Sequence, residues 1–228
     1  MHRVTRILLL VSLGVPALTG GCTRSAGGAE PAPSPRVTSA TGTFAAYSPG
    51  ATAVTYDQGL VPPGAVATLS IAQTSSDSRV WFTVAGLLPN RGYGVHLHTD
   101  PCGATGADAG PHYEHRRPPV PPAAPSQPAP APAAASASSP ASKPAPGPGS
   151  ASGSASATRA NPSYANPQNE VWLDVTTRAD GRASSVATHP WALNPPPRSL
   201  VIHATPTKTG PADAGDAGAR VACLTLPA

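Results

Sequence analysis

The 228-residue chain contains few aromatic residues: two Phe, three Trp and five Tyr make up 4% of it. It has 31 prolines and 22 glycines instead, a composition that indicates a small folded domain joined to unstructured sequence. Charged residues are also scarce, because they make up only 11% of the chain. The formal net charge is +4. Without Arg3 and Arg6, which lie in the leader described next, the charge is +2 (4 − 2). Such a weak and dispersed charge excludes a nucleic-acid-binding protein, which needs a clustered basic face.

The N-terminus lacks an apolar run long enough to span a membrane. Ile7–Leu18 has about half of the roughly 20 residues that a transmembrane helix needs. Basic residues precede this run and the small residues Thr19, Gly20 and Gly21 follow it, which is the pattern that signal peptidases read. We therefore predict a signal peptide at residues 1–21.

Cys22 directly follows these small residues and resembles the cysteine of a bacterial lipobox, although Thr19 stands where a leucine is expected. We predict that Cys22 is lipidated and holds the protein on the outer face of a bacterial cell membrane. The alternative is a soluble secreted protein with a spare thiol. With Cys22 lipidated, Cys102 and Cys223 remain, and an even pair in an exported chain favours a disulfide.

Two segments have too little apolar sequence to form a core. Residues 22–36 predict a flexible tether. Residues 117–160 predict a mobile, partly polyproline-II insertion, since 12 prolines lie between Pro118 and Pro148. The folded domain is then expected at residues 37–228, interrupted by this insertion.

The rest of the chain shows no sustained helical periodicity and predicts short strands. Rough alternation and β-branched residues mark eight of them: Ala45–Tyr56, Ala65–Ala72, Arg79–Leu87, Gly92–His98, Glu170–Thr176, Ala183–Thr188, Ser199–His203 and Arg220–Leu226. Turns are indicated at 89–92 and at 179–181. Eight strands with Gly/Pro-rich connections predict an all-β sandwich or flattened barrel with long loops.

Four histidines occur in contexts that suggest a metal site. His96 and His98, at i and i+2 on a predicted strand, face the same side. His112 follows a Gly-Pro turn, and His203 ends an apolar strand. Taken singly, each has an ordinary alternative as a surface or hydrogen-bonded loop residue. Four imidazoles without thiolates suit copper or zinc.

The order of these motifs resembles the copper/zinc superoxide dismutases. The similar segments are GYGVHLH, a cysteine four residues later, AGPHY, SLVIHA and GDAGARVAC, within residues 92–223. The resemblance implies a Greek-key β-sandwich, copper ligation by His96, His98, His112 and His203, and an intrasubunit disulfide between Cys102 and Cys223. It implies that Arg220 is the catalytic arginine that holds the superoxide anion. Dimer contacts vary in that family, so a homodimer stays open.

The family's zinc site is missing from the sequence. After His112 only His115 precedes the insertion, and Val171 falls near the position of the zinc aspartate. Glu170 or Asp174 is an alternative carboxylate there. We expect copper without zinc, a surface or supporting role for His115, and an exposed turn position for His189. Without zinc, the outer nitrogen of His112 needs another partner: water, Glu114, or a carboxylate such as Asp174.

The sequence thus predicts an exported copper-dependent enzyme that converts superoxide to oxygen and hydrogen peroxide. One alternative is a lipoprotein that binds or buffers copper with little turnover. Retention of Arg220 argues against it, because a pure copper binder has no need of an arginine at the anion position. The other is a structural β-sandwich with vestigial histidines, which the complete set of copper positions disfavours.

Overall fold

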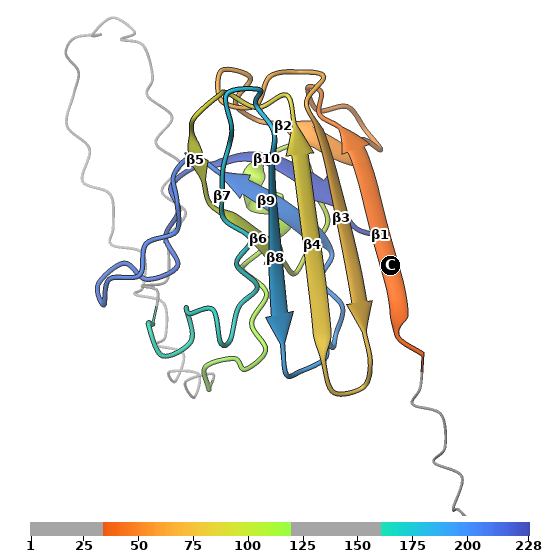
Figure 1. Ribbon diagram of the computed structural model, residues 1–228, viewed down its shortest axis with the longest axis vertical. Helices are drawn as coiled ribbons and strands as arrows, with labels where there is room; N and C mark the ends of the chain where they lie inside the picture. The colour runs from red at the N-terminus through yellow and green to blue at the C-terminus, as the bar shows by residue number, and fades with distance from the viewer. Residues whose placement is uncertain (1–33, 120–160) are drawn as a thin grey trace, which may run out of the picture. The chain divides into compact units, whose positions relative to one another are not determined.

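The computed structural model describes residues 34–119 and 161–228, which form an antiparallel β-sandwich (Figure 1). The first sheet has the strand order β1-β3-β4-β8, with β1 at Arg36–Thr43, β3 at Val66–Gln73, β4 at Ser78–Ala85 and β8 at Ala183–His189. The second has the order β2-β10-β9-β6, with β2 at Ala53–Thr55, β10 at Arg220–Thr225, β9 at Ser199–His203 and β6 at Val95–His98. A two-stranded ladder joins β5 (Gly92–Tyr93) to β7 (Val175–Thr176), and η1 (Gly106–Ala109) is a single 3-10 turn.

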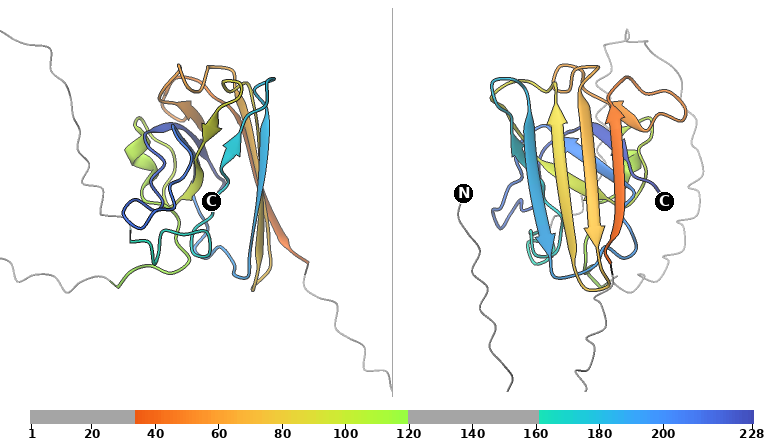
Figure 2. Two further views of the ribbon diagram at one scale, coloured as in Figure 1. Left: turned by 60° about the vertical axis from the view of Figure 1, so that its left-hand side comes forward. Right: turned by 45° about the vertical axis from the view of Figure 1, so that its right-hand side comes forward.

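The expected all-β sandwich is confirmed, since each of the two main sheets has four strands. The chain crosses between the two main sheets five times, from β1 to β2, β2 to β3, β4 to β6, β6 to β8 and β8 to β9, so that strands adjacent in sequence are often in different sheets. Figure 2 shows the first sheet edge-on in its left view and face-on in its right view. The second sheet and the long connections lie on the inner side of the first sheet.

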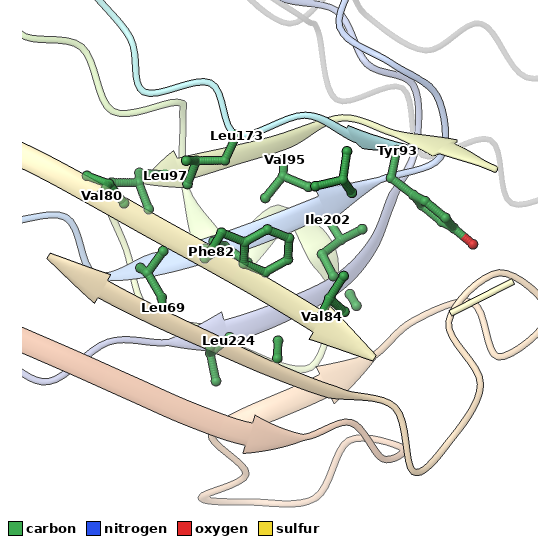
Figure 3. Close-up of a cluster of buried hydrophobic side chains, with 14 of the residues drawn as sticks. Leu69, Val80, Phe82, Val84, Tyr93, Val95, Leu97, Leu173, Ile202 and Leu224 are labelled. Atoms are coloured by element: carbon green, nitrogen blue, oxygen red, sulfur yellow. The ribbon is translucent and has the colours of Figure 1, made fainter. Parts of the chain in front are cut away.

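Alternation of side chains places the core between the sheets. In β3 and β4 every second residue is buried, so that Leu69, Val80 and Phe82 face the second sheet. Leu97 and Ile202 come from that sheet to meet them (Figure 3).

The second sheet is covered on both faces. All residues of β6 and β9 are buried, although only one face of each contributes to the main core. On the outer face Val201 and Cys223 pack with Ala109 of η1 in a second, smaller cluster. The long connections thus cover this sheet, so polar side chains on its outer face are removed from water.

Three expected strands differ from the structure. The segment predicted at Ala45–Tyr56 is a strand only at Ala53–Thr55, and Glu170–Thr176 is a strand only at Val175–Thr176. The strand expected at Gly92–His98 is interrupted at Gly94, where a Cβ would collide with Ala217 and the carbonyl of Thr205. Strand β1 was not predicted, because its run of Ser, Thr, Ala and Gly has few apolar residues. The other predicted strands are confirmed within two residues.

Cys102 and Cys223 form the expected disulfide, with a Cα–Cα distance of 5.7 Å and a sequence separation of 121 residues. The bond joins the connection after β6 to strand β10. It therefore holds η1 and the chain leading to His112 against the second sheet.

The predicted signal peptide at residues 1–21 and the lipidation of Cys22 lie outside the described residues. So do the predicted tether and insertion, except for residues 34–36 and 117–119. No helix in the described ranges is long and apolar enough to cross a membrane.

Candidate metal centre

Four histidines converge on the second sheet. One ring nitrogen from each of His96, His98, His112 and His203 lies within 4.8 Å of the other three. These are the four histidines that the sequence grouped together. Among the described residues, no second group of three or more His, Cys, Asp or Glu side chains converges in this way.

Strand geometry brings three of them together. His96 and His98 alternate with Val95 and Leu97 on β6, so both imidazoles leave the same face of the sheet. His203 ends β9, the antiparallel neighbour of β6. All three side chains are buried, with exposures of 1%, 0% and 3%.

A glycine turn brings in His112 from the connection. Gly110 has φ = 70°, and a Cβ there would collide with the side chains of Thr99 and Asp100. The turn returns the chain to β6, where His112 forms an isolated antiparallel bridge with His98. Only glycine adopts this conformation in so little space, which explains the Gly-Pro-His pattern of the sequence.

Backbone carbonyls fix the orientation of two of the rings. Nδ1 of His98 lies 3.0 Å from the carbonyl oxygen of Gly110, and Nδ1 of His203 lies 3.2 Å from that of Gly218. A carbonyl oxygen only accepts hydrogen bonds, so each Nδ1 carries the proton. The Nε2 atoms of both rings then carry lone pairs and face the cluster.

A hydroxyl and a carboxylate fix His96. Thr207 Oγ1 donates to Asp174 Oδ1 at 2.7 Å and lies 2.6 Å from His96 Nε2. Since the hydroxyl proton is used on the carboxylate, Thr207 accepts a hydrogen bond from His96 Nε2. Asp174 is held in place by the backbone N–H groups of Val95 and Thr207. His96 therefore presents an unprotonated Nδ1 to the cluster.

Glu170 performs the same task for His112. Its Oε2 atom lies 3.0 Å from His112 Nδ1 and also accepts a hydrogen bond from Trp172 Nε1 at 2.6 Å. The Glu170 side chain is only 3% exposed. Because a carboxylate accepts the Nδ1 proton, Nε2 of His112 is the atom with the lone pair.

Four lone pairs consequently point at one another. His96 Nδ1 lies 3.1 Å from His112 Nε2, and the Nε2 atoms of His98 and His203 are 3.4 Å apart. Burial, followed by the neighbouring His112, lowers the pKa of His96 and His98 well below 6.5 and that of His203 to about 3. Protonation is therefore disfavoured, and a metal cation is what such an arrangement can hold.

Arg220 lies beside this cluster at the start of β10. It pairs with His203 in the ladder between β10 and β9, and a bulge at Val221 separates it from the regular register that begins at Ala222. One guanidinium N–H group donates to the carbonyl oxygen of Gly106 in η1 at 2.8 Å. Burial lowers the pKa of Arg220, and its charge in turn lowers the pKa of His96, His98 and His203.

The other candidate residues lie apart from the four histidines. His115 is exposed, as expected, and stacks on the ring of Trp191 with centroids 4.6 Å apart. Glu114 forms an isolated bridge with Glu170, and burial raises its pKa. Of the expected partners of His112, which were water, Glu114 or another carboxylate such as Asp174, the structure has a carboxylate, and it is that of Glu170. Asp174 supports His96 instead.

The expectation of an exposed His189 is wrong. Its side chain is only 5% exposed, because it ends β8 and packs on Trp191 with ring centroids 4.2 Å apart. Burial lowers its pKa. The following proline suggested a surface turn, but the tryptophan two residues later covers the ring.

Thr207 was missed by the sequence analysis, and no motif surrounds it that could have revealed its role. Glu170 was considered only as a possible second-site ligand. The signal that could have found its actual role is its neighbour Trp172, whose indole N–H group needs an acceptor when it is partly buried.

Comparison with known proteins gives little further guidance. No family model matches the chain, and no curated protein matches it. Among solved structures, the Cu/Zn superoxide dismutase from Brucella abortus matches over 84% of this chain and 100% of its own, with 16% identity and a TM-score of 0.45.

Proposed function

We propose that this protein is a copper-dependent superoxide dismutase that works outside the cytoplasm. The observation that carries the proposal is the set of four inward-facing imidazole nitrogens, each fixed by a separate outward partner. Arg220 next to His203 adds a fixed positive charge at the same site. The similarity of the motifs to the copper/zinc superoxide dismutases supplies the reaction.

The donor set fits copper. His96 Nδ1 and the Nε2 atoms of His98, His112 and His203 would hold the ion. Imidazole nitrogens are ligands that suit copper. When bound, copper supplies the alternate one-electron oxidation and reduction by which two superoxide anions and two protons become oxygen and hydrogen peroxide.

Arg220 attracts and orients the anion. Its guanidinium remains charged at any physiological pH, so it needs no proton to hold superoxide. The hydrogen bond to the Gly106 carbonyl fixes one nitrogen of the guanidinium group. The other N–H groups are left available to hold the anion. A buried positive charge beside neutral imidazoles also disfavours their protonation, which keeps the ligands in their metal-binding form.

Glu170 holds the proton on His112 Nδ1. The carboxylate is buried and accepts from both His112 and Trp172, so it stays in one position relative to the imidazole. Partners of this kind set the orientation and basicity of a ligating histidine. In this proposal the carboxylate takes over the orienting role that a zinc ion has in the related family.

We accordingly propose copper without zinc. Beyond His112 the described residues offer the carboxyls of Glu170 and Glu114, while Asp174 is occupied by Val95 and Thr207 and His115 stacks on Trp191. Among the described residues, no group of three such side chains converges apart from the four histidines. Zinc sites take three or four protein ligands, and this position does not provide them.

The location outside the cytoplasm is supported by the Cys102–Cys223 disulfide, since oxidising compartments preserve such bonds. We also propose that a lipid on Cys22 anchors the protein to the membrane. Superoxide is then the small-molecule substrate, and the proposal requires no other partner besides the membrane.

The deciding experiment reconstitutes the protein with copper alone under strict zinc exclusion and measures superoxide dismutation. Copper-dependent turnover that disappears in His203→Ala supports the proposal. Stoichiometric copper binding without turnover overturns it, and makes the protein a copper-binding lipoprotein. Asp77→Asn serves as the control, because Asp77 is exposed in the turn between β3 and β4 on the first sheet and should leave turnover unchanged.

A further inference from the structure

A small cavity of about 220 Å³ lies beside strand β6, separate from the four histidines. Its lining consists of Thr99, Tyr113, Arg117, Pro195, Pro196 and Arg198. Two arginines and a threonine are therefore among the lining residues, and no acidic residue is. The prolines and the buried tyrosine supply the apolar part of the wall.

The backbone around Arg198 is fixed, while its side chain makes no hydrogen bond to any residue that the structure describes. The Arg198 N–H group donates to the carbonyl of His98 at 2.9 Å, and its carbonyl accepts from Leu226 at 2.8 Å. The side-chain Nε is buried without a hydrogen-bond partner among the described residues. Buried donors are normally paired, so the lack of a partner needs an explanation.

Neither arginine has a carboxylate beside it in the cavity wall. The charge of Arg117 lowers the pKa of Glu114, but Glu114 does not line the cavity. No ion pair within the described ranges includes Arg117 or Arg198. Of the 11 acidic residues in the chain, only Glu30 lies outside those ranges, and residues 120–160 contain no acidic residue at all. Asp100 accepts a hydrogen bond from the Thr99 hydroxyl at 3.3 Å, but it is exposed and does not line the cavity.

We propose that this cavity is a binding site for a phosphate group. The planar forks of two arginines match the oxygens of phosphate in bidentate pairs, and the rotatable Thr99 hydroxyl can add a further donor. Two positive charges balance a phosphate, which carries about 1.5 to 2 negative charges at neutral pH, better than they balance a carboxylate. The group belongs either to free inorganic phosphate or to the headgroup of an anionic lipid.

The site is distinct from the proposed superoxide site. Arg220 lies on β10 beside His203, whereas the cavity residues come from the end of β6, from 113–117 and from the chain before β9. The inference therefore does not depend on dismutase activity.

The test uses the full-length protein and titrates inorganic phosphate by calorimetry at physiological ionic strength. We expect saturable binding that Arg198→Gln weakens about tenfold or more, the loss that follows from removing a charged hydrogen-bonding partner. Arg117→Gln should weaken it as well. Arg198→Lys should restore binding only in part, because it keeps the charge and loses the fork.

Two controls decide whether the cavity is responsible. Arg116→Gln removes the same charge one residue away and lies outside this cavity, so it should leave the affinity unchanged. An equal loss in Arg116→Gln would show diffuse surface attraction and overturn the proposal. A loss confined to Arg220→Gln would assign the anion to the histidine site and overturn it too. Thermal unfolding of each variant confirms that the fold is kept.

A second arm distinguishes the source of the phosphate. Vesicles of phosphatidylglycerol are sedimented with the protein and compared with vesicles of phosphatidylcholine. Arg198-dependent binding to phosphatidylglycerol, without saturable binding of inorganic phosphate, identifies the lipid headgroup as the ligand. Saturable binding of inorganic phosphate alone identifies the free ion. Absence of Arg198-dependent binding in both arms rejects the site.

Discussion

Glu170 and His112 are joined by a 3.0 Å contact between a buried carboxylate oxygen and the outer ring nitrogen. Replacement of Glu170 by Gln removes the negative charge and keeps the size of the side chain. We expect copper affinity to fall about 10-fold or more, because partners of ligating histidines have effects of this size. Chelator competition measures it, with Asp77→Asn, a carboxylate-to-amide change at an exposed turn on the first sheet, as the control. Equal affinity in Glu170→Gln and the native protein would contradict the role given to Glu170.

Thr207 holds His96 in one tautomer. Thr207→Val removes the hydroxyl between His96 Nε2 and Asp174 while it keeps the shape of the side chain. We expect a loss of about 10- to 100-fold in copper affinity. Thr209→Val makes the same change two residues further along, at an exposed position, and provides the control. If both variants bind copper alike, Thr207 has no orienting role.

Arg220 is expected to affect turnover and not metal binding. Arg220→Gln should lower kcat/KM for superoxide about 10-fold or more, since it removes the local charge that attracts the anion. Copper affinity should change little, because no ring nitrogen of the four histidines bonds to this guanidinium. The rate of the variant should also depend less on ionic strength. A parallel loss of copper binding would show that Arg220 supports the metal site instead.

The disulfide should contribute strongly to stability. The double variant Cys102→Ser, Cys223→Ser opens a loop of 121 residues, for which the chain-entropy model gives about 4–5 kcal/mol as an upper value. Urea unfolding of the native and variant proteins, each with and without reductant, measures the difference. Reductant should destabilise the native protein but not the double variant. If the variant were as stable as the oxidised native protein, the prediction would be refuted.

The metal-free protein should lose stability in mild acid. The pKa of His203 is about 3 in the folded state and 6.5 in its ordinary state, so the unfolded chain binds more protons between these values. Stability therefore rises with pH through this window and levels off above about 6.5, with each buried histidine contributing up to about 1.4 kcal/mol per pH unit. Urea midpoints between pH 6.5 and 4.5 test this. A constant midpoint would contradict the burial of neutral imidazoles.

The sequence predicted the β-sandwich and the histidine cluster because both depend on short patterns. Alternation along β3 and β4 marks the core face, and the His-x-His spacing puts two imidazoles on one side of β6. The Gly110 turn was also visible, since the tight return to His98 requires glycine.

The supporting partners could not be predicted in the same way. Alternation was assumed for the segment Glu170–Thr176, but only isolated bridges tie Glu170 and Trp172 to their neighbours, so strand periodicity did not apply. Thr207 lies in an irregular connection where only the fold decides which side chain meets His96. His189 was misjudged because its cover, Trp191, depends on how the chain bends after β8.

The partners of the metal centre also determine when it can form. His96 comes from β6, whereas the Gly218 carbonyl, Arg220 and Cys223 all lie on or next to β10, the last strand in chain order. A chain that is cut or stalled during synthesis before β10 has no fixed tautomer at His203 and no closed loop around His112. The native arrangement of the four imidazoles is therefore expected only in chains whose synthesis has passed β10.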